Sequence, residues 1–398
     1  MLAILLPMGD YTPCVMYSLL LSVSFAVASL LASGVAAIAQ PAFPMAKTLD
    51  AIPSIEYGDA RMIALADSFV GQWRSEGDST SPPLTLRVVH MRGRMLTQPL
   101  YVEMVRDGDE AAPVRQWVLS FYRGGEDELR ARVYEFPMGS GLRGMCVGLW
   151  GAPEYLPLVT PGKLDAVGEM RVEMTDQGDS LSAVMPFLLN HETHWTMSAS
   201  WVIGADTLDW KETIFDRKGD ALPRSSVQAN FHRDGEIPRA ETREMGVKVI
   251  DLHKGQGAVA EKGDELVYWY TGWLLDGTVF ETNRLPGKTP LQVTLPPEHL
   301  IDGWKIGLPG IMSTETHVRG GGGVRKILVP PAAGMGSGGG VGSLAVIPPD
   351  SSLIFLIEMV AMKDNTTPPP VMVEDPFTEV GQQPPPGMKK KPSGGGGG

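Results

Sequence analysis

Two patterns of apolar and polar residues follow one another in the first half of the chain. Around residues 60–70, Met62, Leu65 and Phe69 fall at helical spacing, which predicts a short helix. Residues 73–233 then form short alternating runs such as LTLRVVHM and RQWVLSFYR, separated by clusters of Gly, Asp and Pro. These runs predict an antiparallel meander that forms a sandwich or a barrel, and a barrel has the advantage of closing its open edges.

A second β-rich pattern covers residues 246–364, with runs such as GVKVIDLHKGQG, DELVYWYTGWLLDGTVFE, LQVTL, RKILVPP and SLIFLIEMVAM. Between them, HLIDGWKIGL places Ile301, Trp304 and Leu308 on one face of a short helix. A single helix against a sheet predicts an α+β domain. Residues 234–245 are charged and aperiodic, so we expect them to link the two domains.

The two ends of the chain have compositions of their own. Residues 16–39 are apolar and end in Ala-Ile-Ala, the small-residue pattern of a secretory cleavage site, although no Lys or Arg precedes Lys47. We therefore expect residues 1–39 to be a signal peptide or, alternatively, a membrane anchor, followed by a linker at 40–58. The protein is then exported, periplasmic or extracellular, with membrane contact only if this segment is uncleaved. The Pro-, Gly- and Lys-rich residues 365–398 predict a disordered tail.

Charge and cysteine content exclude some classes of partner and cross-link. The 398 residues carry a formal net charge of −12, which disfavours a nucleic-acid partner, because such binding relies on Lys and Arg. The chain has two cysteines, Cys14 and Cys146, and signal cleavage removes the first, so we expect no internal disulfide.

The aromatic run DELVYWYTG predicts more than an ordinary hairpin. Alternation places Leu266, Tyr268 and Tyr270 on one face of a strand, and Phe280 returns on the next strand after an Asp-Gly turn. Together with the helix that carries Trp304, these side chains predict a concave aromatic pocket.

Five blocks extend this pattern: GDELVYWYTGWLLDGTVFETN, PLQVTL, HLIDGWKIGLPGI, RKILVPPAAGMG and VIPPDSSLIFLIEMVAM. In this order and spacing they resemble the FK506-binding-protein (FKBP) type of peptidyl-prolyl isomerase, over residues 246–364. The resemblance implies a twisted antiparallel sheet wrapped around a short helix, with Trp304 as the floor of a proline pocket. The catalytic positions that it implies are Tyr270, Phe280, Glu281, Ile301, Trp304 and Phe355. The implied substrate contacts are Leu291, Leu300, Met335, Val346 and Ile347.

The resemblance also implies a reaction without nucleophile, metal or cofactor. Rotation about an X-Pro bond meets a barrier of about 18–20 kcal/mol because the planar amide is resonance-stabilised. A dry aromatic site tolerates the twisted, less charge-separated state, and preferential binding of that state is catalysis. In the family, the backbone N–H at the position of Ile301 donates a hydrogen bond to the peptide carbonyl. We expect proline-containing polypeptides as clients and assistance in folding of exported proteins as the role.

An alternative function is a proline-peptide binding module or chaperone with little turnover. It rests on three departures from the family pattern: Leu291 replaces a usual Phe, Glu281 replaces an Asp, and Met335 replaces a Tyr.

Residues 59–233 resemble the CpcT/CpeT family of phycobiliprotein chromophore lyases in the motifs FVGQW, LYVEM, PVRQWVLSFYR, RVYEF and FDRKGD. Members of that family are calycin-like β-barrels that hold an open-chain tetrapyrrole. The resemblance implies that Tyr101, Glu103, Arg115 and Gln116 face the mouth of a site for a tetrapyrrole or another apolar ligand. The alternative is a structural barrel whose charged residues form internal ion pairs. The expected fold is mainly β: a calycin-like antiparallel barrel followed by the α+β domain.

Overall fold

The structure is a computed structural model, and it describes residues 60–362 apart from 78–81, 125–127, 176–177, 185–186, 191–194, 224 and 313–321. All the described residues belong to one compact unit of the chain. Three predicted segments lie outside the described residues, namely the signal peptide or anchor at 1–39, the linker at 40–58 and the tail at 365–398. Among the described residues, no helix has the length and apolar character needed to span a bilayer.

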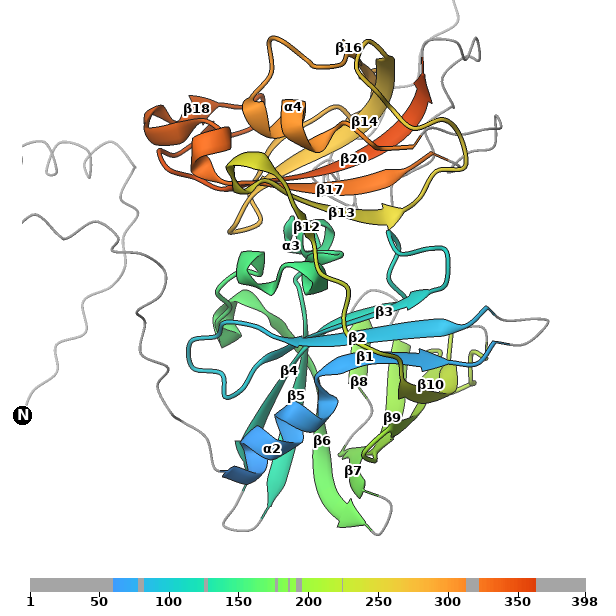
Figure 1. The fold of residues 1–398 in the computed structure, drawn as a ribbon. Helices are drawn as coiled ribbons and strands as arrows, with labels where there is room; N and C mark the ends of the chain where they lie inside the picture. Colours follow the sequence, from blue (N-terminus) through green and yellow to red (C-terminus); the bar gives the residue numbers. More distant parts are fainter. Residues whose placement is uncertain are drawn as a thin grey trace, which may run out of the picture. The chain divides into compact units, whose positions relative to one another are not determined.

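The first domain is a ring of antiparallel strands (Figure 1). They are β1 (Gly71–Ser75), β2 (Leu84–His90), β3 (Leu100–Arg106), β4 (Arg115–Arg123), β5 (Leu129–Glu135), β6 (Asp165–Thr175), β7 (Gly178–Ala183), β8 (Phe187–Asn190), β9 (Trp195–Ile203), β10 (Thr207–Phe215) and β11 (Val227–Arg233). The order is β10-β11-β1-β2-β3-β4-β5-β6-β7-β9, and β9 pairs with β10 to close the ring, while β8 adds to β9. The predicted barrel is thereby confirmed, and its ring has no open edge.

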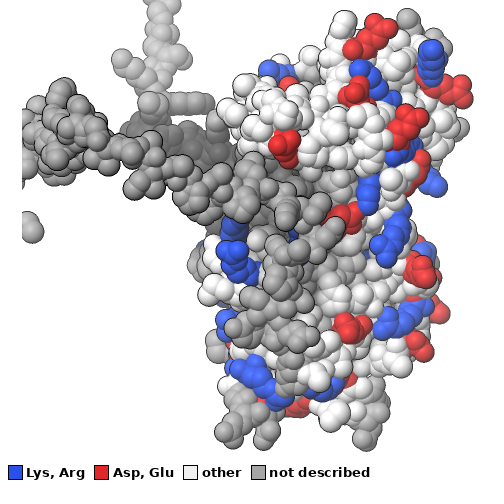
Figure 2. All heavy atoms as spheres, turned by 60° about the vertical axis from the view of Figure 1, so that its left-hand side comes forward, with Lys and Arg blue, Asp and Glu red and all other residues white. Residues whose placement is uncertain are grey.

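The outer face of the barrel carries charged side chains of both signs. On β5, Ala131 and Val133 belong to the buried core, and the alternating residues Arg130 and Arg132 both pair with Glu169 of β6. Figure 2 shows acidic and basic side chains interspersed over one face of the molecule rather than gathered by sign. On this face, no large basic area forms among the described residues.

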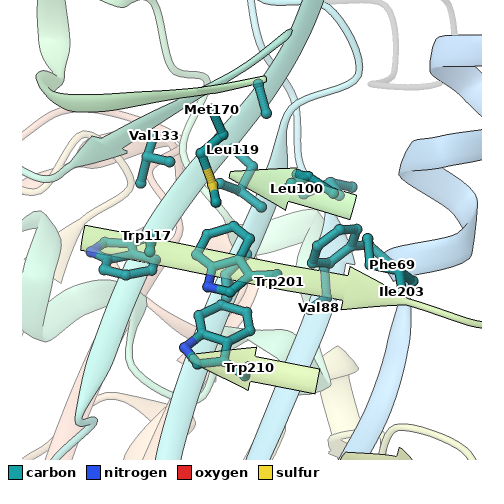
Figure 3. Close-up of a cluster of buried hydrophobic side chains, with 14 of the residues drawn as sticks. Phe69, Val88, Leu100, Trp117, Leu119, Val133, Met170, Trp201, Ile203 and Trp210 are labelled. Carbon is teal, nitrogen blue, oxygen red and sulfur yellow. The ribbon is translucent and has the colours of Figure 1, made fainter. Parts of the chain in front are cut away.

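Aromatic side chains fill the lumen of the barrel (Figure 3). Trp201 and Trp210 stack with ring centroids 4.0 Å apart, and Trp117 lies 5.8 Å from Trp201. The predicted helix is confirmed as α2 (Ala60–Phe69), whose buried Phe69 meets Trp201 edge-on at 6.2 Å. The lumen is therefore the hydrophobic core of this domain.

The chain between β5 and β6 folds into short helices, which are α3 (Leu142–Cys146), η1 (Leu149–Gly151), η2 (Pro153–Tyr155) and η3 (Pro161–Lys163). The buried Met145 in this segment packs in one cluster with Ile250, Leu328 and Ile354 of the second domain. The fully buried Lys326 donates from Nζ to the carbonyl of Met145 at 2.6 Å. This segment thus covers one face of the second sheet.

The second domain is a twisted antiparallel sheet with one α-helix among its described residues (Figure 1). The strands are β12 (Glu241–Thr242), β13 (Lys248–His253), β14 (Glu265–Leu274), β15 (Val279–Thr282), β16 (Leu291–Thr294), β17 (Val324–Val329), β18 (Gly340–Val341), β19 (Val346–Ile347) and β20 (Leu353–Met362). The helices are α4 (Asp302–Gly307) and the 3-10 turns η4 (Glu244–Gly246), η5 (Pro331–Ala333) and η6 (Gly336–Gly338). The sheet order is β12-β13-β17-β20-β14-β15, with β16 paired to β14, and β18 pairs with β19 separately. The α+β prediction is confirmed, and β12 lies within the segment that we expected to be a linker.

Candidate active site

Strand β14 supplies the first two aromatic side chains of the candidate site. Its alternation places Tyr268 and Tyr270 in the core cluster on the face of the sheet that α4 covers. Asn283, just after β15, fixes the backbone between them: it accepts from Tyr270 N at 2.7 Å and donates to Tyr268 O at 3.1 Å. The hairpin turn uses Gly277 at φ +89°, a conformation that favours glycine. Turn chemistry and one buried amide therefore set the position of both rings.

Helix α4 brings Trp304 against these tyrosines. The Trp304 ring meets Tyr270 edge-on, with centroids 5.0 Å apart and an interplanar angle of 85°. It meets Phe355 of β20 in the same way, at 5.1 Å and 89°. Edge-to-face packing of this kind is favourable because the positive ring edge meets the negative ring face. The predicted floor residue thus lies at the centre of the aromatic cluster.

Phe280 of β15 completes the cluster. It packs edge-on against Phe355 at 5.5 Å, and both rings approach the strand at Gly272. A Cβ added at Gly272 would lie 2.7 Å from the Phe280 ring and 2.9 Å from the Phe355 ring. Glycine at this position leaves room for both rings to approach β14. The catalytic aromatic side chains predicted from the sequence are therefore in mutual contact.

The predicted substrate contacts form a gradient from buried to exposed. Ile347 is fully buried in the cluster, and Leu291 and Leu300 pack against it while half-buried. Met335 is 38% exposed and Val346 is 66% exposed. The half-buried Leu291 and Leu300 are therefore the predicted substrate contacts that connect the cluster to the surface.

The polar groups of the cluster are few. The pKa of the Tyr270 hydroxyl is raised by burial and by the nearby carboxylate of Glu281. Burial also raises the pKa of Tyr268. Among the described residues, the Tyr268 hydroxyl and the indole N–H of Trp304 have no hydrogen-bond partner. The burial of these polar groups indicates that the surroundings of Trp304 are shielded from water.

Ile301 contributes its backbone. It is the N-cap residue of α4, with extended dihedrals of φ −59° and ψ 153°, and its carbonyl accepts from Trp304 N at 3.0 Å. Its own N–H precedes the helix and has no acceptor among the described residues. One donor is therefore available beside the Trp304 ring.

Three of the four predicted barrel ligands lie outside the lumen. Tyr101 and Glu103 alternate with the lumen residues of β3, and Gln116 donates to the Tyr101 hydroxyl at 2.9 Å. Glu103 accepts from Tyr101 and from the indole of Trp150 at 2.7 Å, and burial raises its pKa. These side chains join β3 and β4 to the segment that contains α3 and η1.

Arg115, the fourth, lies at the lumen. Its Nε donates to Glu212 of β10 at 2.8 Å, and the same carboxylate accepts from Trp210 Nε1 at 2.7 Å. The Glu212 side chain is fully buried, and burial raises its pKa. A ligand role for these four residues stays a prediction.

One contributor to the aromatic cluster was not assigned from the sequence. Tyr268, which alternation placed on the pocket face, packs 5.5 Å from Trp304. Nothing in the sequence indicated a role for Asn283 beyond its place at the end of the hairpin, because its hydrogen bonds to β14 depend on the strand register. No group of three or more His, Cys, Asp or Glu side chains in the described part of the chain is placed to hold a metal ion.

Comparison with known proteins finds likeness in the second domain. A family model described as FKBP-type peptidyl-prolyl cis-trans isomerase matches residues 257–360. An FK506-binding protein of Neisseria meningitidis serogroup B is 41% identical over 66 residues, which are 17% of this chain and 60% of that protein. FK506-binding protein 1 of Aspergillus oryzae is 33% identical over 73 residues, which are 16% of this chain and 63% of that protein. The chain thus spans about 60% of the length of these relatives.

Solved structures also show distant likeness. AtFKBP13 has 30% identity and a TM-score of 0.26, covering 31% of this chain and 98% of that one. The CRL protein of Arabidopsis has 11% identity and a TM-score of 0.37, covering 44% of this chain and 97% of that one. With TM-scores this low, neither likeness supports a statement about function. The resemblance of the barrel to the CpcT/CpeT family stays a prediction.

Proposed function

We propose, since residues 257–360 belong to the FKBP-type peptidyl-prolyl cis-trans isomerase family, that this chain catalyses rotation about X-Pro bonds in polypeptides. The observation that carries the proposal is the set of edge-on contacts that Trp304 makes with Tyr270 and Phe355. A proline ring bound against Trp304 would lie in a dry, apolar environment. Such an environment favours the twisted amide, which has lost the charge separation of the planar bond.

One backbone donor, the N–H of Ile301, would position the peptide. The N–H of Ile301 lies beside the cluster and is free to donate to the carbonyl of a bound peptide. A hydrogen bond that fixes the carbonyl while the proline ring is held by Trp304 restricts rotation to the X-Pro bond. The side chains of the cluster offer no nucleophile in this mechanism, which forms no covalent bond.

Turnover is favoured over a purely binding role by the contact between Glu281 and Tyr270. The carboxylate lies close enough to the Tyr270 hydroxyl to raise its pKa, although the Glu281 side chain is one methylene longer than the Asp of the family pattern. The tyrosine ring therefore keeps a fixed orientation at the edge of the cluster. The binding-module alternative then rests on Met335 and Leu291, which leave the rim apolar.

The clients that we propose are exported polypeptides with an apolar residue before proline. The apolar rim formed by the half-buried Leu291 and Leu300, which pack against the cluster, supports an apolar residue before the proline. The apolar residues 16–39 support a location outside the cytoplasm, either periplasmic or extracellular. The barrel has a structural role in this proposal, because aromatic side chains occupy its lumen.

The test is the cis-to-trans rate of a short Leu-Pro peptide with the full chain. We expect acceleration by the wild type, and a fall in kcat/KM of at least about tenfold, or 1.4 kcal/mol, in Trp304→Leu. Trp210→Phe in the barrel lumen is the matched control and keeps the wild-type rate. A wild-type chain that leaves the uncatalysed rate unchanged would overturn the proposal. Equal rates for wild type and Trp304→Leu would remove Trp304 from the mechanism.

A further inference from the structure

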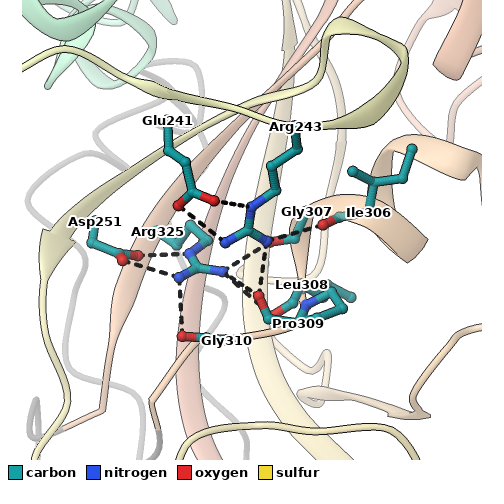
Figure 4. A network of polar contacts seen from close by, with 9 residues as sticks. All are labelled: Glu241, Arg243, Asp251, Ile306, Gly307, Leu308, Pro309, Gly310 and Arg325. Atoms are coloured by element: carbon teal, nitrogen blue, oxygen red, sulfur yellow. Dashed lines mark hydrogen bonds and ion pairs between the residues drawn. The ribbon is translucent and has the colours of Figure 1, made fainter.

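Two guanidinium groups converge on the carboxyl end of α4 (Figure 4). Arg325 of β17 donates to the carbonyls of Gly307 at 3.0 Å, Pro309 at 2.8 Å and Gly310 at 3.1 Å. Arg243, between β12 and η4, donates to the carbonyls of Ile306 at 3.0 Å and Pro309 at 2.8 Å. The last carbonyls of the helix thus have charged donors from two separate parts of the chain.

Each guanidinium is itself held by a carboxylate. Asp251 of β13 accepts from both Nε and NH2 of Arg325, at 2.6 and 3.0 Å. Glu241 of β12 accepts from Nε and NH2 of Arg243, at 2.9 and 3.3 Å. Two-point contacts of this kind fix the plane of a guanidinium as well as its position. The two carboxylates therefore orient the guanidinium groups toward the carbonyls of the helix.

α4 needs such support because it is short. It spans six residues, Asp302–Gly307, and isolated helices of this length are unstable in water. The carbonyls of its last turn have no intrahelical donor, and cations at this end also oppose the negative pole of the helix dipole. Loss of Arg243 leaves the Ile306 carbonyl without a side-chain donor and leaves Pro309 with Arg325 alone, which weakens the hold on the end of the helix.

The opposite end of the same helix carries the candidate site. Ile301 is its N-cap, and Trp304 lies in its first turn. The helix also lies directly on β17, since a Cβ at Gly303 would come 2.4 Å from Val329 and one at Gly307 would come 2.6 Å from Ile327. A shift at the carboxyl end therefore moves the Trp304 ring and the Ile301 N–H along the sheet.

We propose that Arg243 is a positioning residue for the isomerase site, acting through α4 on Trp304 and the Ile301 N–H. This inference rests on the proposed function. Arg243 precedes the matched residues 257–360, so the functional unit extends upstream into the segment that joins the two domains. Arg325 supports the same end of the helix from within the sheet.

The test compares four full-length chains: wild type, Arg243→Ala, Arg243→Lys and the control Arg239→Ala. Arg239 is an exposed arginine of the same connecting segment, four residues earlier. The measurements are kcat and KM on a Leu-Pro peptide, and hydrogen exchange of the amides in α4. We expect Arg243→Ala to lower kcat about tenfold, with a smaller change in KM, and to speed exchange in α4 selectively. Lysine keeps the charge with fewer directed donors, so Arg243→Lys lies between Arg243→Ala and wild type.

Two results overturn the inference. One is an Arg243→Ala chain with wild-type kcat and wild-type exchange in α4. The other is faster exchange throughout the sheet, which indicates general destabilisation instead of positioning. A wild-type chain without isomerase activity refutes the proposed function separately, and exchange in α4 still decides whether Arg243 holds the helix.

Discussion

The tryptophans of the barrel and the tryptophan of the second domain are packed in different ways. Trp201 and Trp210 stack at an interplanar angle of 18° in the barrel lumen, and Trp117 stacks on both. Trp304 instead meets Tyr270 and Phe355 edge-on, at 85° and 89°. Trp117, Trp201 and Trp210 are at most 1% exposed, whereas the half-buried Leu291 and Leu300 connect the cluster around Trp304 to the surface.

This difference separates a core from a candidate site. Both regions bury aromatic rings, and buried aromatic rings stabilise any fold by removing apolar area from water. Stacked rings in a closed lumen leave no side to which a ligand can bind. Edge-on rings beside an apolar rim and a free backbone N–H offer a face and a donor together. Continuity with the surface, more than the number of rings, marks the functional cluster.

The largest effect is expected when the barrel stack is broken. Trp201→Ala leaves a cavity among fully buried rings, and we expect it to lower the free energy of unfolding by about 3–5 kcal/mol. The isomerase rate should stay unchanged while the chain remains folded. Urea denaturation and the Leu-Pro assay measure the two quantities. Trp195→Ala, at a half-buried position of the same strand, is the control with a smaller loss. A loss of isomerase rate in folded Trp201→Ala would contradict the separation of the two regions.

The ion pair at the lumen should have the next effect. Glu212→Gln removes the negative partner of Arg115, and we expect a loss of about 3 kcal/mol because one buried charge is left uncompensated. Replacing both residues by Leu should recover much of that loss. The double-mutant cycle, followed by urea denaturation, gives the coupling between them. No coupling would show that the pair contributes nothing to the barrel.

The smallest effect is expected at the outer face of the barrel, in acid. The Tyr122 hydroxyl, with Arg130 and Arg132, lowers the pKa of Glu169 to about 2. Because the folded-state pKa is depressed, the stabilisation is fully present above the unfolded value, about 4.3, and is lost as the pH falls toward 2. Glu169 is 25% exposed, so we expect only about 1 kcal/mol. Glu169→Gln should remove this part of the pH dependence, and an unchanged acid profile would exclude Glu169 as its source.

Local patterns in the sequence predicted much of the fold and of the aromatic cluster. Alternation placed Tyr268 and Tyr270 on one face, and the Asp-Gly pair placed Phe280 on the next strand. The register that joins β14 to β20 brings Phe355 to Gly272, and only the family-like order of the blocks indicated it beforehand.

Other features depend on contacts that no local pattern encodes. Alternation places Tyr101 and Glu103 on one face of β3 and their neighbours in sequence on the other face. Which of these two faces lines the lumen depends on the pairing of β9 with β10, which closes the barrel. The role of Arg243 depends on carbonyls more than 60 residues later in the chain. Such contacts follow from topology, so they became visible only in the assembled fold.

The most direct test of the central claim is a titration of the full chain with the Leu-Pro peptide, followed by NMR at the tryptophan indole N–H signals and the backbone amide of Ile301. If the cluster around Trp304 binds the peptide, the signals of Trp304 and Ile301 shift with peptide concentration, and those of Trp201 and Trp210 keep their positions. Shifts confined to the barrel tryptophans would place peptide binding elsewhere and contradict the assignment of the site.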